Sequence, residues 1–270
     1  MSNRFKEIRR DLIHQVYIVN LGRVPSEREL SYYINSNQPI EEIVYSIAYM
    51  SSGQEKGTKL PLSLAVFCKD NQDSIELCIR SVLSVVSEII VVDTGSTDNT
   101  LDICKRYTDK IYKVGFTDFG SIRTLTAHLA TQPWVLGLDS DETISKEQLP
   151  LIENLLADET VDLWGLPRRR WADLGRTTQV EIEAYPDYQY RLFRNDKKIK
   201  YVGRVHESAE GPATKKESPE GPHIDHFQDV FKSGDALKKR NELYKKLYEL
   251  DTVDGIIHSC PPVSSIDDDR

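Results

Sequence analysis

The spacing of apolar residues follows one pattern from about residue 60 to about residue 156. Short continuous apolar runs predict buried strands, and they lie at 60–67, 88–93, 110–114 and 133–139. Between them, apolar residues recur every three or four positions, which predicts helices over 73–86, 101–107, 122–130 and 146–156. Regular alternation of strands and helices is typical of an α/β domain, so we expect a mainly parallel sheet with helices on both faces.

The chain before residue 60 and near the C-terminus does not show this alternation of strands and helices. Residues 1–57 have helical spacing, including a third helix that Asn37 would cap, and 51–59 form a polar linker. Residues 229–250 predict a basic amphipathic helix, which either packs on the domain with its lysines outward or lies on an anionic membrane surface. We therefore divide the chain into a helical appendage (1–57), a main domain (60–228), and a C-terminal helix with a flexible tail (229–270).

Composition and charge narrow the function classes. The 270 residues carry 35 Lys and Arg against 43 Asp and Glu, a net charge of -8, which argues against a nucleic-acid-binding surface. No apolar run is long enough for a membrane span, and the first 20 residues lack an apolar signal-peptide core. The four cysteines have no metal-finger spacing, so we interpret them as reduced thiols of a cytoplasmic protein.

Acidic side chains follow three of the predicted strands. Asp70 follows the first strand, Asp93 ends the second, and Asp139 and Asp141 end the fourth. Ligands of parallel sheets bind at the carboxyl ends of the strands, so these acids indicate a binding site. In an extended segment residues i and i+2 face the same side, so one of Asp139 and Asp141 can hold a ribose hydroxyl and the other a divalent cation bound to phosphate oxygens. The alternative is a solvated turn without a ligand.

The motifs at these positions resemble a known family. The stretches SLAVFCKDNQDSIELCIRSVLSVVSEIIVVDTGSTDNT and FGSIRTLTAHLATQPWVLGLDSDETIS resemble family 2 glycosyltransferases of the GT-A fold, which is Rossmann-like. The later YPDYQYRLFRNDKKIKYVGRVHES is similar to the bacterial branch that contains lipopolysaccharide-core enzymes. The resemblance spans residues 61–227.

The resemblance implies roles for individual residues. The nucleotide would be bound by Phe67, Lys69, Asp70, Asp93, Arg123, Asp139 and Ser140. Thr124 stands where the family often has Asn, which leaves that contact in question. Mn²⁺ or Mg²⁺, bridging the donor diphosphate, would be held by Asp139 and Asp141, with His226 as a third ligand.

Inversion by direct displacement needs a general base for the acceptor hydroxyl. Glu207 is our first candidate and Asp187 the second, because a carboxylate can take the proton at neutral pH. Glu207 could instead pair structurally with Arg191 or Arg204. The basic run 168–170 is compatible either with an anionic acceptor or with a charged sheet edge.

The sequence therefore predicts an inverting, metal-dependent glycosyltransferase. It would move a sugar from a nucleoside-diphosphate sugar, with UDP preferred, to a glycan, lipid-linked or protein acceptor in the cytoplasm. Peripheral membrane contact at the inner face and a partner protein on the N-terminal helices are further expectations, and no nucleic acid is expected. One alternative stays open, a catalytically idle glycan- or nucleotide-binding module, because Thr124 replaces the Asn of the family. A sugar nucleotidyltransferase would need a glycine-rich phosphate loop after the first strand, and the segment FCKDNQD has no glycine.

Overall fold

The structure is a computed structural model. It describes residues 3–21, 24–35, 43, 47, 59–180, 185–196, 198–231 and 234–254. The predicted linker up to residue 58, the tail beyond residue 254 and most of the third N-terminal helix lie outside the described residues.

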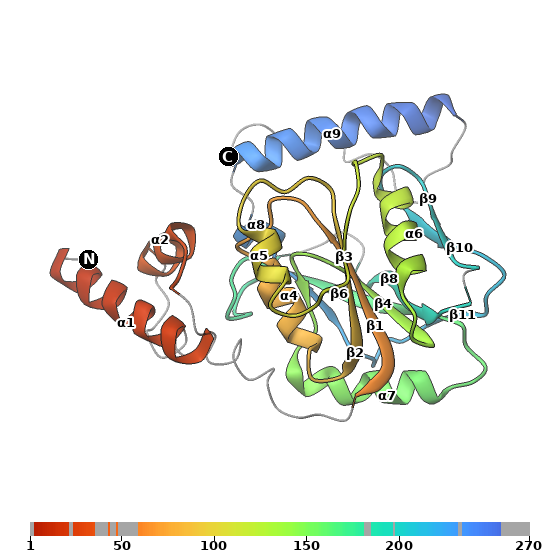
Figure 1. Cartoon of the computed structure of the whole chain (residues 1–270), viewed down its shortest axis with the longest axis horizontal. Coiled ribbons are helices and arrows are strands. Elements are labelled where there is room, and N and C mark those ends of the chain that lie inside the picture. The colour runs from red at the N-terminus through yellow and green to blue at the C-terminus, as the bar shows by residue number, and fades with distance from the viewer. Residues whose placement is uncertain are drawn as a thin grey trace.

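The main domain is built on one large mixed sheet (Figure 1). Its strand order is β3-β2-β1-β4-β8-β6-β12-β5, with β7 and β11 paired to β6. The strands are β1 (Leu60–Cys68), β2 (Val86–Asp93), β3 (Ile111–Lys113), β4 (Trp134–Asp139), β5 (Glu142–Thr143), β6 (Leu163–Trp171), β7 (Gln179–Val180), β8 (Asp187–Arg194), β11 (Lys215–Glu217) and β12 (Ile224–His226). A separate hairpin joins β9 (Lys200–Val202) to β10 (Ser208–Glu210). The first four strands are parallel, and β8 runs antiparallel between β4 and β6.

Both faces of the sheet are covered, because successive strand residues point to opposite sides. Leu62, Leu64 and Val66 of β1 belong to one core with apolar residues of α4 (Ile75–Val82), α5 (Thr100–Cys104) and α7 (Leu149–Ala157). Ala65, on the other face, belongs to a second core with α6 (Phe119–Leu129) and the β9–β10 hairpin. The predicted α/β class with helices on both faces is confirmed.

The described elements differ from the expected ones mainly at their ends. The helix expected over 73–86 is shorter, because strand β2 already begins at Val86. A 3-10 turn, η2 (Lys146–Gln148), precedes α7, whose first turn contains Pro150. The helix expected over 229–250 is divided into α8 (Gln228–Phe231) and α9 (Gly234–Val253).

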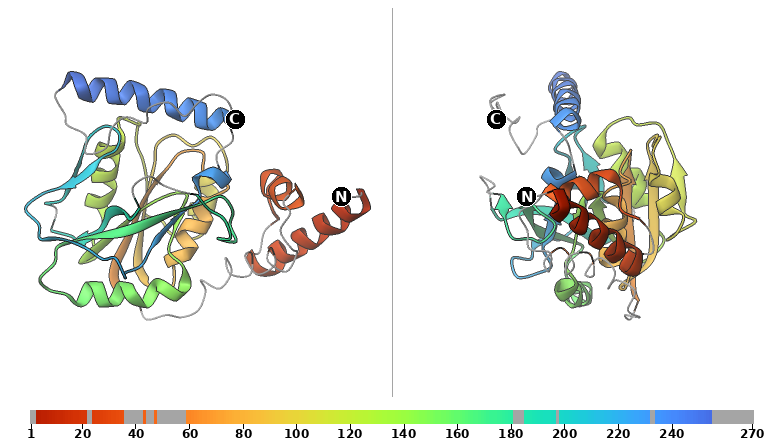
Figure 2. Two further views of the ribbon diagram at one scale, coloured as in Figure 1. Left: turned by 180° about the vertical axis from the view of Figure 1, so that it is seen from behind. Right: turned by 90° about the vertical axis from the view of Figure 1, so that its left-hand side faces the viewer.

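The N-terminal helices α1 (Asn3–Leu21) and α2 (Glu27–Asn35) pack beside the main domain (Figure 2). Ser26 and Glu29 form a reciprocal cap at the start of α2, with backbone-to-side-chain bonds of 2.7 and 3.2 Å. Apolar residues of both helices share one core with Leu174 and Phe227 of the main domain. The appendage is therefore docked on the main domain by apolar burial.

One carboxylate away from the sheet's carboxyl edge is held unusually tightly. Glu88 of β2 is buried and accepts hydrogen bonds from Ser63, from Lys110, and from the backbone and hydroxyl of Thr131, the last two at 2.7 Å. Burial alone would raise its pKa, but the bonds from Lys110, Ser63 and Thr131 outweigh burial and lower the pKa of Glu88 to about 2.

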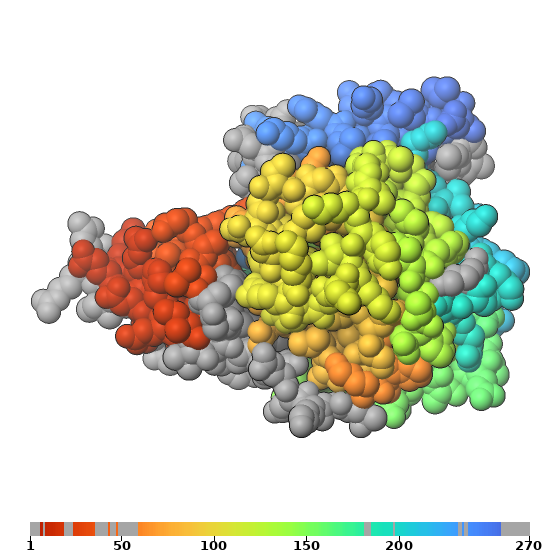
Figure 3. All heavy atoms as spheres, viewed as in Figure 1, coloured from red at the N-terminus to blue at the C-terminus, as the bar shows by residue number. Residues whose placement is uncertain are grey.

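Helix α9 lies across the edge of the sheet where β1, β2 and β4 end (Figures 1 and 2). Leu247 is buried, whereas Lys238, Lys239, Lys245 and Lys246 are exposed. The space-filling view shows the helix as one flank of the molecule (Figure 3). This confirms the interpretation that the helix packs on the domain with lysines outward. In the described part of the chain no helix is long and apolar enough to cross a membrane.

Candidate active site

The three acidic strand exits lie together, as the sequence predicted. In the parallel register Phe67 of β1 is opposite Asp139 of β4, and Cys68 is opposite Asp93 of β2. Parallel neighbours bring their carboxyl ends to one edge, so Asp70, Asp93 and Asp139 occur on adjacent exits. This edge is the candidate active site.

Two of these acids shape the loops at the edge. Asp93 is only 2% exposed and accepts backbone N–H bonds from Gly95 and Ser96 at 3.3 and 3.1 Å. Gly95 has a φ of 107°, which favours glycine. Asp70 accepts from the backbone of Thr97 at 2.7 Å and so ties the β1 exit to the β2 exit. Both carboxylates thus have structural partners, and their contact with a nucleotide stays a prediction. Lys69 is exposed beside them.

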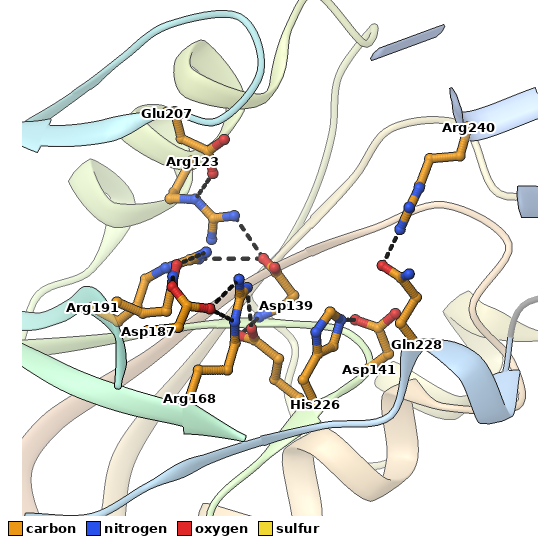
Figure 4. A network of polar contacts seen from close by, with 12 residues as sticks. Arg123, Asp139, Asp141, Arg168, Asp187, Arg191, Glu207, His226, Gln228 and Arg240 are labelled. Atoms are coloured by element: carbon orange, nitrogen blue, oxygen red, sulfur yellow. Dashed lines mark hydrogen bonds and ion pairs between the residues drawn. The ribbon is translucent and has the colours of Figure 1, made fainter. Parts of the chain in front are cut away.

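Arg123 is the centre of the site (Figure 4). It comes from α6, is 5% exposed, and donates to Asp139 and to Glu207, each at 2.6 Å. Its guanidinium also lies over the rings of Phe67 and Tyr201, 5.0 and 5.5 Å from their centroids. Burial opposes the charge, but the carboxylates of Asp139 and Glu207 outweigh burial and raise the pKa of Arg123. Arg123 therefore joins the strand-exit acid Asp139 to Glu207, which lies 84 positions after Arg123 in the sequence.

A second part of the network surrounds Asp187. Arg168 of β6 donates to Asp187 through Nε at 2.8 Å and Nη2 at 2.7 Å, a two-pronged contact. Gln189 donates to the other Asp187 oxygen at 2.6 Å. Arg191, two residues further along β8, donates to Asp139 at 3.3 Å. Asp139 is thus shared by two arginines, and Asp187 is linked to it through the β8 residues.

Glu142 is joined to this network and is fully buried. Its carboxylate accepts from the backbone N–H of Asp139 at 2.9 Å and from Arg168 at 3.4 Å. Burial and the charge of Asp139 raise the pKa of Glu142 to about 7, with Arg168 and His226 acting in the opposite direction. Glu142 thereby fixes the backbone from which Asp139 projects.

Asp141 and His226 form a separate contact. His226 Nε2 lies 3.5 Å from Asp141 Oδ1, and the next residue, Phe227, donates its backbone N–H to the Asp141 carbonyl at 2.9 Å. Ser140, between the two acids, is buried. The described residues contain no group of three or more His, Cys, Asp or Glu side chains placed to hold a metal ion. Two of the three predicted ligands are therefore adjacent, while Asp139 is bonded to arginines.

Several expectations for neighbouring residues change. Glu207 pairs with Arg123, not with Arg191 or Arg204. In the basic run, Arg168 is bonded to Asp187, Arg169 to His223, and Arg170 to Asp229. These internal pairs favour a structural role for the run over a site for an anionic acceptor. Thr124 accepts the backbone N–H of Tyr201 at 2.8 Å, so it holds the β9 strand against α6.

Our sequence reasoning missed two parts of the site. Gln189 and Arg191 follow the predicted Asp187 at alternate positions of β8, so the spacing of polar residues in DYQYRLFR could have assigned both to the site. Tyr244 and Arg240 of α9 also lie at this edge. Their position depends on where the helix folds back, and no local signal encodes that.

Comparison with known proteins identifies the fold and family. A model of the family described as "Glycosyl transferase family 2" matches residues 63–208, more than half of the 270-residue chain. In structure, the chain resembles S. aureus TarS 1–349, crystallised with UDP-GlcNAc, with a TM-score of 0.50 and 17% identity over 76% of this chain and 68% of that one.

Curated relatives point the same way. The chain is 28% identical over 190 residues to the SPbeta prophage-derived glycosyltransferase SunS of Bacillus subtilis, covering 66% of this chain and 42% of SunS. It is 33% identical over 118 residues to the lipopolysaccharide core biosynthesis glycosyltransferase LpsC of Rhizobium meliloti, covering 41% and 43%. The chain thus spans about two fifths of the length of these relatives. With its fold, its ordered motifs and the family match in agreement, the chain belongs to glycosyl transferase family 2.

Proposed function

We propose that the protein is an inverting, metal-dependent glycosyltransferase that uses a UDP-sugar and transfers the sugar to a hydroxyl of a glycan, lipid-linked or protein acceptor. One observation carries the proposal: Arg123 joins Glu207 to Asp139 at the carboxyl edge of the parallel strands. A donor-side acid and an acceptor-side acid are thereby held in one partly buried network. Family membership supports the same reaction, and the TarS complex suggests UDP as the first nucleotide to test.

The donor would bind along the exits of β1, β2 and β4. Phe67, half-buried beside the Arg123 guanidinium, offers an aromatic face to the base. Asp70 and Asp93, which shape the two loops, would border the base and ribose, with Lys69 at the rim. Asp139, held by Arg123 and Arg191, would accept from a ribose hydroxyl.

Asp141 and His226 are the residues that would hold the divalent cation. A carboxylate oxygen and an imidazole nitrogen at one edge fit an ion that takes its remaining ligands from substrate phosphates and water. The bound ion would offset the negative charge that develops on the departing diphosphate. Asp139 was predicted as a further ligand, but two arginines already engage its Oδ1, so we assign it to the ribose.

Glu207 is our candidate for the general base. In the transfer, the acceptor oxygen bonds to the anomeric carbon from the side opposite the diphosphate while the carbon–phosphate-oxygen bond breaks. Glu207 takes the hydroxyl proton, and the nucleoside diphosphate leaves with the bonding pair. Arg123 donates to only one Glu207 oxygen, whereas Asp187 has both oxygens engaged by Arg168 and Gln189. This difference favours Glu207 over Asp187.

The setting of the reaction is also proposed. Cys68, Cys78 and Cys104 are free, buried thiols, which agrees with a cytoplasmic enzyme. The exposed lysines of α9 would give peripheral contact with an anionic inner membrane surface that carries a lipid-linked acceptor. The docked helices α1 and α2 would present the surface for a partner protein.

A donor panel tests the proposal. The wild-type chain is incubated with UDP-, GDP- and dTDP-sugars in Mn²⁺ or in EDTA, and nucleotide release and the unfolding midpoint are measured. We expect one UDP-sugar to be hydrolysed slowly and to raise the midpoint only with metal. In Asp141→Asn, donor binding should no longer depend on the metal. In the control Asp102→Asn, which changes an exposed acid on α5, donor binding should keep its metal dependence. Absence of binding by every donor contradicts the proposal.

A further inference from the structure

Helix α9 is held against the residues that carry the proposed chemistry. Tyr244 packs edge-on against Phe119 at the start of α6, with ring centroids 5.2 Å apart, and lies 5.8 Å from the ring of His206, the neighbour of Glu207. Burial raises the pKa of Tyr244; the charge of Arg240 opposes this effect, and the charges of Glu207, Asp139 and Asp141 add to it. The middle of α9 therefore lies within electrostatic range of the site carboxylates.

The far end of α9 is fastened to the same loop. Asp251 is fully buried and accepts from the backbone N–H of Arg204 at 2.7 Å and from its Nη1 at 3.0 Å. Arg204 Nη2 also contacts Asp254 at 2.5 Å. Because Arg204 lies three positions before Glu207, the helix and the candidate base are positioned by one loop.

Arg240 of α9 differs from the other arginines of the site. Arg123, Arg168 and Arg191 each bind a carboxylate, but among the described residues Arg240 donates hydrogen bonds to the neutral side-chain oxygens of Gln228 and Asn241. Its Nε is buried and has no acceptor among the described residues. A buried N–H without an acceptor is costly, so this atom is available to an incoming anion.

The place of Arg240 decides which anion that would be. Its partner Gln228 comes directly after His226 and Phe227 in the sequence. The His226 ring faces the Asp141 carboxylate, and the Phe227 backbone N–H binds the Asp141 carbonyl. Figure 4 shows Arg240 pointing from α9 toward Gln228 and Asp141. A cation with one free donor therefore lies next to the pair proposed to hold the diphosphate-bound metal.

We propose that α9 forms the roof of the donor site and that Arg240 binds a phosphate of the nucleoside diphosphate, an inference that rests on the proposed function. A guanidinium presents several N–H donors in one plane and matches phosphate oxygens in pairs. A phosphate would take the place of the Gln228 oxygen and also satisfy Nε. The contact strengthens as charge accumulates on the leaving diphosphate, so it would assist bond cleavage.

Binding of UDP and uridine to the full chain tests the inference in the presence of Mn²⁺. Calorimetry measures UDP affinity, and saturation-transfer NMR measures uridine affinity, for the wild type, Arg240→Gln and Arg240→Lys. We expect Arg240→Gln to weaken UDP binding about tenfold or more and to leave uridine binding unchanged, because uridine lacks the phosphates. Arg240→Lys keeps the charge and should recover part of the UDP affinity.

Lys239→Gln is the matched control, because it removes the same charge from an exposed neighbour on α9 and should not alter UDP affinity. Equal loss of UDP and uridine affinity in Arg240→Gln would show that Arg240 only holds the helix in place, and unchanged UDP affinity would also overturn the inference. Failure of the wild type to bind UDP overturns the proposed function itself, which separates the two failures.

Discussion

Replacement of Arg123 by Met should destabilise the protein strongly. Arg123 is 5% exposed and bonds Asp139 and Glu207 at 2.6 Å, so its removal leaves Glu207 without its cation and leaves Asp139 with only Arg191, at 3.3 Å. Loss of one partner of a buried ion pair costs about 3–5 kcal/mol. For a chain of this size, about 2–4 °C of unfolding midpoint is lost per kcal/mol, so we expect a decrease of roughly 6–20 °C.

Denaturant and thermal unfolding at pH 7 measure this cost. The double variant Arg123→Met with Glu207→Gln should recover about 1–2 kcal/mol, because one orphaned charge is gone. The control is Arg10→Met, whose partner Glu27 lies 3.1 Å away with side-chain exposures of 48% and 85%, so about 0–1 kcal/mol is expected. A loss below about 1 kcal/mol for Arg123→Met would refute the view that this cation holds the site together.

Two further predictions concern Glu207 and Glu88. Glu207→Gln keeps an acceptor for Arg123 but cannot take a proton, so kcat should fall about 100-fold or more while UDP affinity is retained. The control is Glu210→Gln, which changes an exposed residue. Turnover of Glu207→Gln equal to that of the wild type would exclude Glu207 as the base. Glu88, with its pKa lowered from 4.5 to about 2, stabilises the fold fully above about pH 4.5 and loses that contribution as pH falls toward 2. Unfolding free energies of wild type and Glu88→Gln should therefore differ by about 3 kcal/mol at pH 6 and converge near pH 2; a difference that stays constant with pH would contradict the lowered pKa.

The sequence predicted the fold best where the signal is local. The apolar runs gave β1, β2 and β4 to within two residues, and their parallel pairing placed the acidic exits at one edge. The boundary at Val86 was harder to predict, because apolar residues continue without interruption from the helix into the strand.

The site was predicted residue by residue but not as a network. Arg123 and Glu207 were named from the family resemblance and Asp139 from its position at a strand exit, yet their direct linkage depends on how the β9–β10 hairpin folds over α6. Asp141 and His226 were expected in one ligand set with Asp139, and the structure places only the first two in contact. Long-range geometry of this kind has no periodic signature in a single sequence.

The surface against which helix α9 packs could not be predicted from the sequence. The amphipathic pattern of the helix is the same whether the apolar face meets a membrane or the domain. The burial of Asp251 against Arg204 decides between them, and an acid at that position reads as a solvent-facing residue in the sequence.

A crystal structure of the full chain with UDP and Mn²⁺ tests the central claim most directly. We predict UDP at the carboxyl ends of β1, β2 and β4, with its base near Phe67 and its diphosphate between the Asp141–His226 pair and Arg240. UDP bound away from this edge, or no bound nucleotide at saturating concentration, would contradict the account.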